Sequence, residues 1–143
     1  MTERCKMDYG HRWCLMCGSD NPLSLGLTFR ADDVGVVYGS FQSHNGFQGY
    51  NDYMHGGVVS ALFDSVMTHC LFHRGVRAVA GELNIRVKSP VPCMAALDLR
   101  AWVVSVITPV YYVKAELLYE QQVMARAKAT FMEIVIDGSS TLS

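Results

Sequence analysis

Residues 56–73 read GGVVSALFDSVMTHCLFH, and this run carries the clearest architectural signal in the chain. At helical spacing its apolar side chains fall on nearly every side: Val58, Val59, Ala61, Leu62, Phe63, Val66, Met67, Cys70, Leu71 and Phe72. A helix that is apolar nearly all round has to be covered by other elements. Asp52 could cap its start and Gly75 its end. We therefore predict one long buried helix over residues 56–73.

Downstream of this run the apolar period changes to two residues. Apolar and polar side chains alternate over residues 79–88, 97–103, 111–119 and 123–131. Consecutive segments with one apolar face are typical of an antiparallel sheet. The short connections at Thr108-Pro109 and Glu120-Gln121 predict hairpins between neighbouring strands.

Upstream of the helix the strand signals are shorter. Residues 25–30 and 34–43 predict two strands joined by a turn at Asp32-Asp33, and the polar, glycine-bearing residues 45–53 predict a loop. Together these elements predict an α+β fold, in which an antiparallel sheet of about six strands wraps round one central helix.

The chain has the length of one domain with a substantial core, and half of its 143 residues are hydrophobic. We predict an N-terminal arm over residues 1–24, the sheet-and-helix domain over residues 25–137, and a tail over residues 138–143. Nearly balanced charge, 12 Lys plus Arg against 13 Asp plus Glu, gives no drive toward nucleic acid or an anionic membrane. Charges interrupt every apolar run before about 18 residues, so no transmembrane helix is expected, and no signal peptide is apparent. The odd number of cysteines, five, favours reduced thiols and a cytoplasmic location.

Asp64 stands out because it places a charge in the middle of the predicted buried helix, where an unpaired charge is costly. At helical spacing it shares a face with Ser60 and Thr68. One interpretation is a carboxylate that is hydrogen-bonded by the neighbouring hydroxyls or that faces a wet cleft. The other is a functional carboxylate, since perturbed carboxylates gather at active sites.

His55-Gly56-Gly57 precedes the helix, and its two glycines lower helix propensity there. Without Cβ atoms, their N–H groups can approach a ligand closely at the positive end of the helix dipole. Such donors suit a thioester carbonyl, whose oxygen becomes negative during attack. The alternative is a glycine-rich loop end with a solvent-facing His.

The run from His55 to Asp64 resembles the HGG-x6-D signature of hotdog-fold thioesterases of the phenylacetate-pathway type. Three further segments resemble the same family: GFQGY at residues 46–50, GELNIR at residues 81–86 followed by Pro90, and CLMCG at residues 14–18. The resemblance runs in order over residues 14–131 and implies an acyl-CoA thioesterase with a hotdog fold.

The resemblance also implies roles for individual residues. Asp64 would activate water as a general base or attack the thioester directly. Gly57, or the neighbouring N–H of Gly56, would polarise the carbonyl, and His55 would support the thioester end or orient the loop. Substrate-site residues would include Ser60 and Thr68 on the helix, and Gln48 or Asn51 would hold the water.

In dimers of this family the helix of one subunit faces the long strand of the other. The resemblance therefore implies a homodimer or homotetramer with shared sites, an acyl-CoA substrate and no cofactor. One departure concerns Ala80, where many relatives carry Ser or Thr. We expect Glu82 to lie on the same strand face as Ala80, where it could compensate for the missing hydroxyl.

The basic residues of the sheet have two interpretations. Arg86 and Lys88 lie on the strand nearest the proposed site, and the phosphates of CoA need such partners. The alternative is a solvated outer face of the sheet.

Other functions and sites compete with this interpretation. A hydroxyacyl-thioester dehydratase would also use a His and a carboxylate, and Ala80 makes a non-catalytic acyl-CoA-binding module plausible. The spacing His11-x2-Cys14-x2-Cys17 would suit a metal, but it offers three ligands and lacks a second Cys-x2-Cys half. We therefore predict a thiol pair without metal.

Overall fold

The computed structural model describes residues 3, 4 and 10–134, so the predicted tail and most of the first nine residues lie outside the described residues. The elements in chain order are β1 (Glu3–Arg4), β2 (Phe29–Ala31), β3 (Val37–Gln42), η1 (Asn45–Phe47), α1 (Gly56–His73), β4 (Ala78–Val87), β5 (Ala96–Ile107), β6 (Val110–Tyr119) and β7 (Gln122–Glu133). The predicted helix over residues 56–73 is confirmed at both ends.

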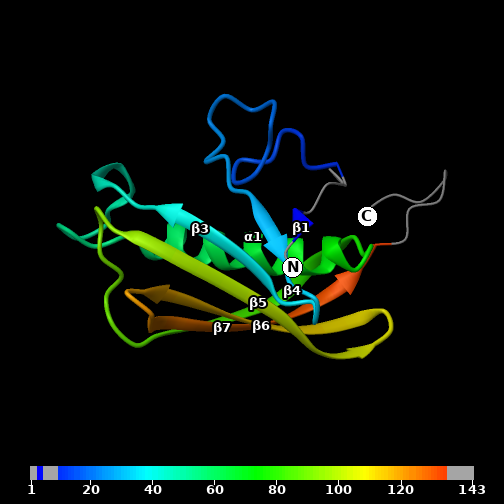
Figure 1. Ribbon diagram of the computed structural model, residues 1–143. Helices are drawn as coiled ribbons and strands as arrows, with labels where there is room; N and C mark the ends of the chain where they lie inside the picture. Colours follow the sequence, from blue (N-terminus) through cyan, green and yellow to red (C-terminus); the bar gives the residue numbers. More distant parts are fainter. Residues whose placement is uncertain (1–2, 5–9, 135–143) are drawn as a thin grey trace.

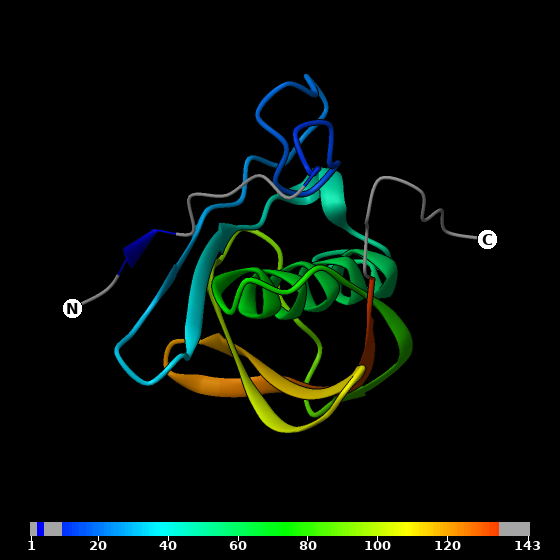
Figure 2. The ribbon, with the colours of Figure 1, turned by 90° about the vertical axis from the view of Figure 1, so that its right-hand side faces the viewer.

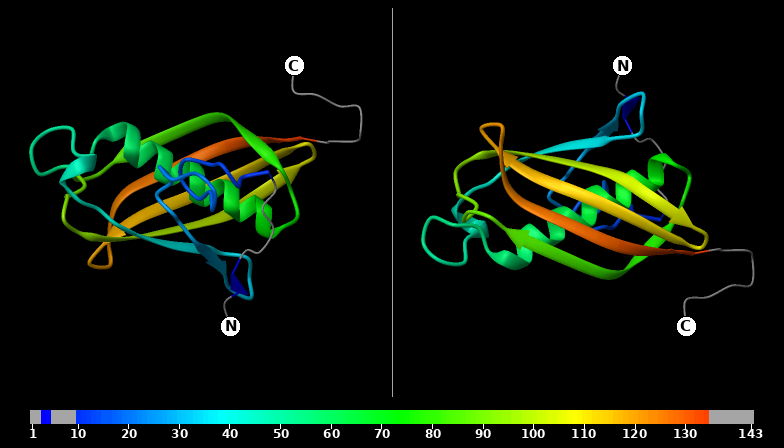
Figure 3. Two further views of the ribbon diagram at one scale, coloured as in Figure 1. Left: turned by 90° about the horizontal axis from the view of Figure 1, so that it is seen from above. Right: turned by 90° about the horizontal axis from the view of Figure 1, so that it is seen from below.

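The strands form one sheet in the order β1-β2-β3-β5-β6-β7-β4, and every neighbouring pair is antiparallel (Figure 1). The sheet curls, and α1 lies in its hollow (Figure 2). Seen from below, the strands cross the helix obliquely (Figure 3). The predicted α+β hotdog fold is confirmed, with the two-residue β1 as an additional strand. Within the described residues, β4 pairs with β7 and its other edge is open.

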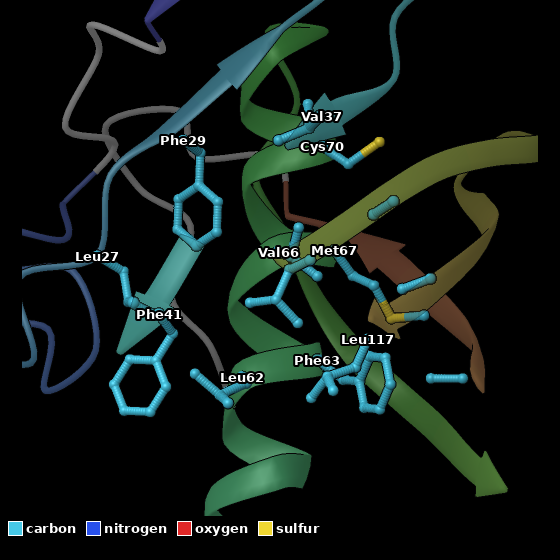
Figure 4. Close-up of a cluster of buried hydrophobic side chains, with 14 of the residues drawn as sticks. Leu27, Phe29, Val37, Phe41, Leu62, Phe63, Val66, Met67, Cys70 and Leu117 are labelled. Atoms are coloured by element: carbon cyan, nitrogen blue, oxygen red, sulfur yellow. The ribbon is translucent and has the colours of Figure 1, made fainter. Parts of the chain in front are cut away.

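The core lies between α1 and the inner face of the sheet. The helix contributes side chains that are 0 % exposed, namely Leu62, Phe63, Val66, Met67 and Cys70. Figure 4 shows this row beside apolar side chains of the sheet, among them Phe29, Val37 and Leu117. On β7 three successive inward side chains are small and buried: Ala125, Ala127 and Ala129. Their size lets this strand approach the helix closely.

The residue that caps the helix start differs from the prediction. The N-cap is His55, whose imidazole Nδ1 accepts a hydrogen bond from the Gly57 N–H at 2.8 Å. Asp52 adopts a left-handed backbone with φ 72° in the preceding loop, so its predicted capping role is wrong. Gly75 confirms the predicted end, because it follows the C-cap Arg74 and has φ 77°. Glycine adopts this left-handed backbone conformation more readily than other residues do.

The two strands before the helix are shorter than predicted. β2 spans Phe29–Ala31 where residues 25–30 were predicted, and β3 spans Val37–Gln42 where residues 34–43 were predicted. The N–H groups of Leu25 and Leu27 bind carbonyls of the N-terminal arm instead of a strand. After β2, the Asp32 carboxylate accepts hydrogen bonds from Val34 and Val36 and holds a turn that delays β3.

Both predicted hairpins are confirmed, since β5–β6 and β6–β7 are each joined by two residues. At the second hairpin, Glu120 and Gln121 have φ of 50° and 67°, as a type I′ turn requires. None of the helices in the described residues has the length and apolar character needed to cross a membrane.

Candidate active site

The first turn of α1 is held by its preceding loop. The N–H of His55 donates to the Phe47 carbonyl at 2.7 Å, which brings η1 against the helix start. Gly49 permits this approach, because a Cβ at that position would lie 3.3 Å from the His55 Cα. The loop and the His55 cap therefore fix the orientation of the two glycines.

The two glycines are not equivalent as hydrogen-bond donors. The N–H of Gly57, the first donor predicted for the thioester carbonyl, is already bound to the His55 side chain. Among the described residues none accepts a hydrogen bond from the N–H of Gly56, and the space where its Cβ would stand is open. Of the two, the N–H of Gly56 is therefore the one available to a ligand at the positive end of the helix dipole.

An apolar groove of about 710 Å³ adjoins Gly56. It runs between the N-terminal half of α1 and the inner face of β4. Its lining comprises Tyr50, Tyr53, Met54, Gly56, Val59, Ser60, Ile85, Val87, Pro90 and Val91. A groove of this character suits an acyl chain whose polar end lies at the helix N-terminus.

Asp64 lies on the exposed side of α1, between the buried Phe63 and Ser65, so the helix is not covered all round as predicted. The predicted polar stripe is present only in part. The Ser60 hydroxyl donates to the Gly56 carbonyl at 2.9 Å rather than to the carboxylate, and Thr68 is buried at 8 % exposure. Neighbouring protein still removes part of the carboxyl's hydration, and this burial raises the pKa of Asp64.

His11 is a neighbour of Asp64 that sequence reasoning missed. The N-terminal arm lies over the side of α1 that the sheet leaves uncovered (Figure 2). Burial lowers the pKa of His11, and the Asp64 carboxylate opposes that shift. The His11 ring packs edge-on against Phe72, with ring centroids 4.9 Å apart. No local pattern could have indicated this contact, because it depends on how the arm folds back.

Two loop residues predicted to hold water lie outside the groove lining. The Gln48 side-chain carbonyl accepts a hydrogen bond from the Asp52 N–H at 3.1 Å, so it holds the loop together. Asn51 is exposed on the same loop.

A β-bulge in β4 separates Ala80 from Glu82. Ala80 pairs with the buried Phe131, whereas Glu82 pairs with Thr130, so the register shifts between them. Directly opposed residues share a sheet face, which places Ala80 toward the helix and Glu82 outward. The prediction that Glu82 shares the face of Ala80 is therefore wrong, because an extra residue interrupts the alternation.

The two residues that were predicted to bind phosphate, Arg86 and Lys88, also lie outside the groove lining. Arg86 pairs with Arg126, on the outer face where Glu116 binds Arg126 at 3.0 Å and Arg100 at 2.6 Å. Lys88 is exposed just beyond the end of β4. Arg86 thus belongs to the charged outer face that the sequence left open as the alternative.

His55→Ala is expected to lower the free energy of unfolding by about 1 kcal/mol, the usual effect of removing an N-cap acceptor. His55→Asn should retain most of the stability, because asparagine is a strong N-cap residue. Urea denaturation at neutral pH would measure both. An equal loss in the two variants would show that the cap is not what His55 contributes.

The curled antiparallel sheet around one central helix, with a groove at the helix N-terminus, defines a hotdog-fold protein. The thioesterase superfamily model matches residues 51–125, which include the helix, β4, β5 and β6. The chain therefore belongs to the thioesterase superfamily. No curated protein matches the chain in sequence.

Solved structures show the same fold. A thioesterase superfamily protein superposes with TM-score 0.75 and 23% identity over 80% of this chain, which spans 60% of that protein. A putative thioesterase from Ralstonia eutropha, related to phenylacetic acid degradation, gives TM-score 0.68 and 25% identity, covering 76% of this chain and 85% of that one. A Streptococcus mutans protein bound to acetyl-CoA gives TM-score 0.70 and 17% identity, with coverages of 76% and 88%.

Proposed function

We propose that this protein hydrolyses acyl-CoA or other acyl-carrier thioesters. The observation that carries the proposal is the apolar groove that ends at Gly56, on the first turn of the helix that also bears Asp64. An acyl chain in this groove would place its thioester carbonyl at the helix N-terminus. The acetyl-CoA complex of the Streptococcus mutans neighbour supports a CoA thioester as the ligand.

Each residue has a chemical task in this proposal. The Gly56 N–H donates to the carbonyl oxygen and stabilises the negative charge that develops there. Asp64 removes a proton from water, or attacks the carbonyl carbon itself, and its raised pKa makes it a stronger base than an ordinary aspartate. His55 keeps the loop and the first helical turn in place through its bonds to Gly57 and Phe47.

The helix geometry supports a site that is shared between two chains. Gly56 and Asp64 lie eight positions apart on α1, which is about 12 Å along the axis. A carbonyl within about 3–3.5 Å of an attacking group cannot also touch a donor at that distance. We therefore propose that Gly56 of one subunit acts with Asp64 of a second copy. The open edge of β4, beside the groove, offers a surface for such a homodimer or for a larger homotetramer.

The location of the protein belongs to the same proposal. Among the described residues Cys14, Cys17 and Cys93 carry free thiols. Reduced thiols are the normal state of cysteine in the cytoplasm. We propose a cytoplasmic enzyme on this ground.

A thiol-release assay over acyl-CoA chains of increasing length tests the activity. Release of free CoA that saturates with substrate supports hydrolysis. Loss of water from a hydroxyacyl-CoA, with CoA retained, would replace the proposal with a dehydratase. Tight acyl-CoA binding without thiol release would indicate a binding module, the alternative that Ala80 suggests.

The pH profile of kcat/KM should report the ionisation of Asp64. The carboxylate is the reactive form, so activity is lost as pH falls through the pKa of Asp64. Because burial raises that pKa, the loss should set in above the value of about 3.9 that an unperturbed aspartic acid shows. An acid limb centred at or below the unperturbed value would contradict this assignment.

A further inference from the structure

The N-terminal arm brings together three side chains that the proposed hydrolysis does not use: His11, Cys14 and Cys17. Their possible ligand atoms all lie within 4.8 Å of one another. We propose that these residues bind a zinc ion and that the ion fixes the arm against α1. This site is separate from the groove and does not depend on the proposed activity.

The spacing of the ligand atoms fits zinc. The Cys17 sulfur lies 3.7 Å from Nδ1 of His11. In a tetrahedral site with zinc bonds of about 2.3 Å to sulfur and 2.0–2.1 Å to nitrogen, those two ligand atoms are about 3.6 Å apart. The arm therefore holds them near their coordinating distance without rearrangement. Two thiolates and an imidazole are also a ligand set that selects zinc over harder cations.

The backbone of the arm is folded as a tight loop that presents both sulfurs. The Met16 N–H points at the Cys14 sulfur at 3.3 Å, a bond that strengthens when the sulfur is a thiolate. The Gly18 N–H donates to the Cys14 carbonyl at 2.8 Å and closes the loop. A Cβ at Gly18 would lie 2.5 Å from the Arg12 carbonyl oxygen, so glycine is required for this closure.

Sequence spacing alone argued against a metal, because a second Cys-x2-Cys half is absent. The fold changes that argument by placing the imidazole of His11 beside the thiols. Three protein ligands leave the fourth position for solvent, a coordination that zinc adopts in catalytic sites. Binding would release the two thiol protons to solvent and leave the His11 ring neutral. No change of oxidation state is involved.

The position of the cluster indicates what the ion would stabilise. Met16, between the two cysteines, is buried in the core, and its carbonyl accepts from the Leu27 N–H at 3.0 Å. His11 rests on Phe72 of α1, with ring centroids 4.9 Å apart, so the cluster lies against the helix that bears the candidate base. An ion at the cluster would cross-link residues 11–17 of the arm and hold them against α1.

The test is metal analysis of the full chain, purified under reducing conditions and equilibrated with zinc before exhaustive dialysis. We expect one zinc per chain, and we expect Cys14→Ser and Cys17→Ser each to lose it. Cys93→Ser removes a buried thiol remote from the arm in sequence and should keep the ion. Cobalt substitution adds a spectroscopic readout, because tetrahedral Co²⁺ with thiolate ligands absorbs intensely in the visible range.

Each other outcome overturns the proposal. Metal-free wild-type chain after this treatment would exclude the site, and so would a Cys14–Cys17 disulfide found by thiol counting. Zinc retained by a folded Cys14→Ser, Cys17→Ser double variant would place the ion elsewhere. Where a variant fails to fold, chelation of zinc from the wild-type chain serves instead: it should raise the protease sensitivity of the arm, and unchanged sensitivity would contradict the role assigned to the ion.

Discussion

Asp64→Asn is expected to lower kcat/KM for acyl-CoA hydrolysis by about 10²–10⁴-fold, the usual range for loss of a general base, while the chain stays folded. The amide keeps the size of the carboxyl but cannot accept a proton from water or form an acyl intermediate. Burial raises the pKa of Asp64, so the fold favours the protonated form. Stability therefore falls as pH rises from the unfolded to the folded pKa, and the neutral Asn variant should be at least as stable as wild type at neutral pH.

The matched control for this variant is Asp98→Asn. Asp98 is an exposed carboxylate on β5 that accepts a hydrogen bond from the Ser40 hydroxyl at 3.2 Å, which an asparagine oxygen can also accept. Its activity and denaturation midpoint should match wild type. Full turnover in the Asp64→Asn variant would remove Asp64 from the mechanism.

Gly56→Pro is expected to lower kcat by about 10²–10³-fold, the effect of losing one oxyanion donor. Proline lacks the N–H, yet it is well tolerated at the first position of a helix. The preceding residue, His55, already has φ −60° and ψ 134°, the extended conformation that proline requires before it. The variant thus removes the donor and little else. Gly56→Ala, which keeps the N–H, is the control and should lose much less activity.

Mixing the two inactive variants distinguishes a shared site from one built within a single chain. If Gly56 and Asp64 act across subunits, a heterodimer of Gly56→Pro and Asp64→Asn chains contains one intact site and one doubly altered site. Random exchange of subunits in equal amounts should then restore about a quarter of wild-type activity. Equal mixing without any recovery, once heterodimers are verified by mass spectrometry, would assign both residues to the same chain.

The helix and the sheet could be predicted because their signals are local. Apolar side chains on nearly every side of residues 56–73 and period-two alternation afterwards each reflect burial of one element against another. The position of the candidate site at the helix N-terminus followed from two glycines and a resemblance. These predictions depend on neighbours within a few residues, which a sequence displays directly.

The predictions that were wrong depend on contacts between distant residues or on the one extra residue of the β4 bulge. Gly81 occupies an apolar position of the alternating pattern in β4, and although a glycine within a strand can mark a bulge, the alternation masked it here. The sequence identified Gly57 as a hydrogen-bond donor, but it did not show that the His55 imidazole already accepts the bond from the Gly57 N–H. The contact of His11 with Phe72 of α1 joins residues far apart in the chain, and it depends on how the arm folds back over the helix.

The open edge of β4 has a consequence for how the protein would be assayed. A site completed by a second copy exists only in the associated state, so its amount follows the dimer dissociation constant. Specific activity would then fall on dilution below that constant and recover on concentration. A substrate that contacts both chains would reduce this loss of specific activity, because it binds only to the dimer and so favours association. An apparent cooperativity in substrate could thus arise from assembly, without any change of conformation within the subunit.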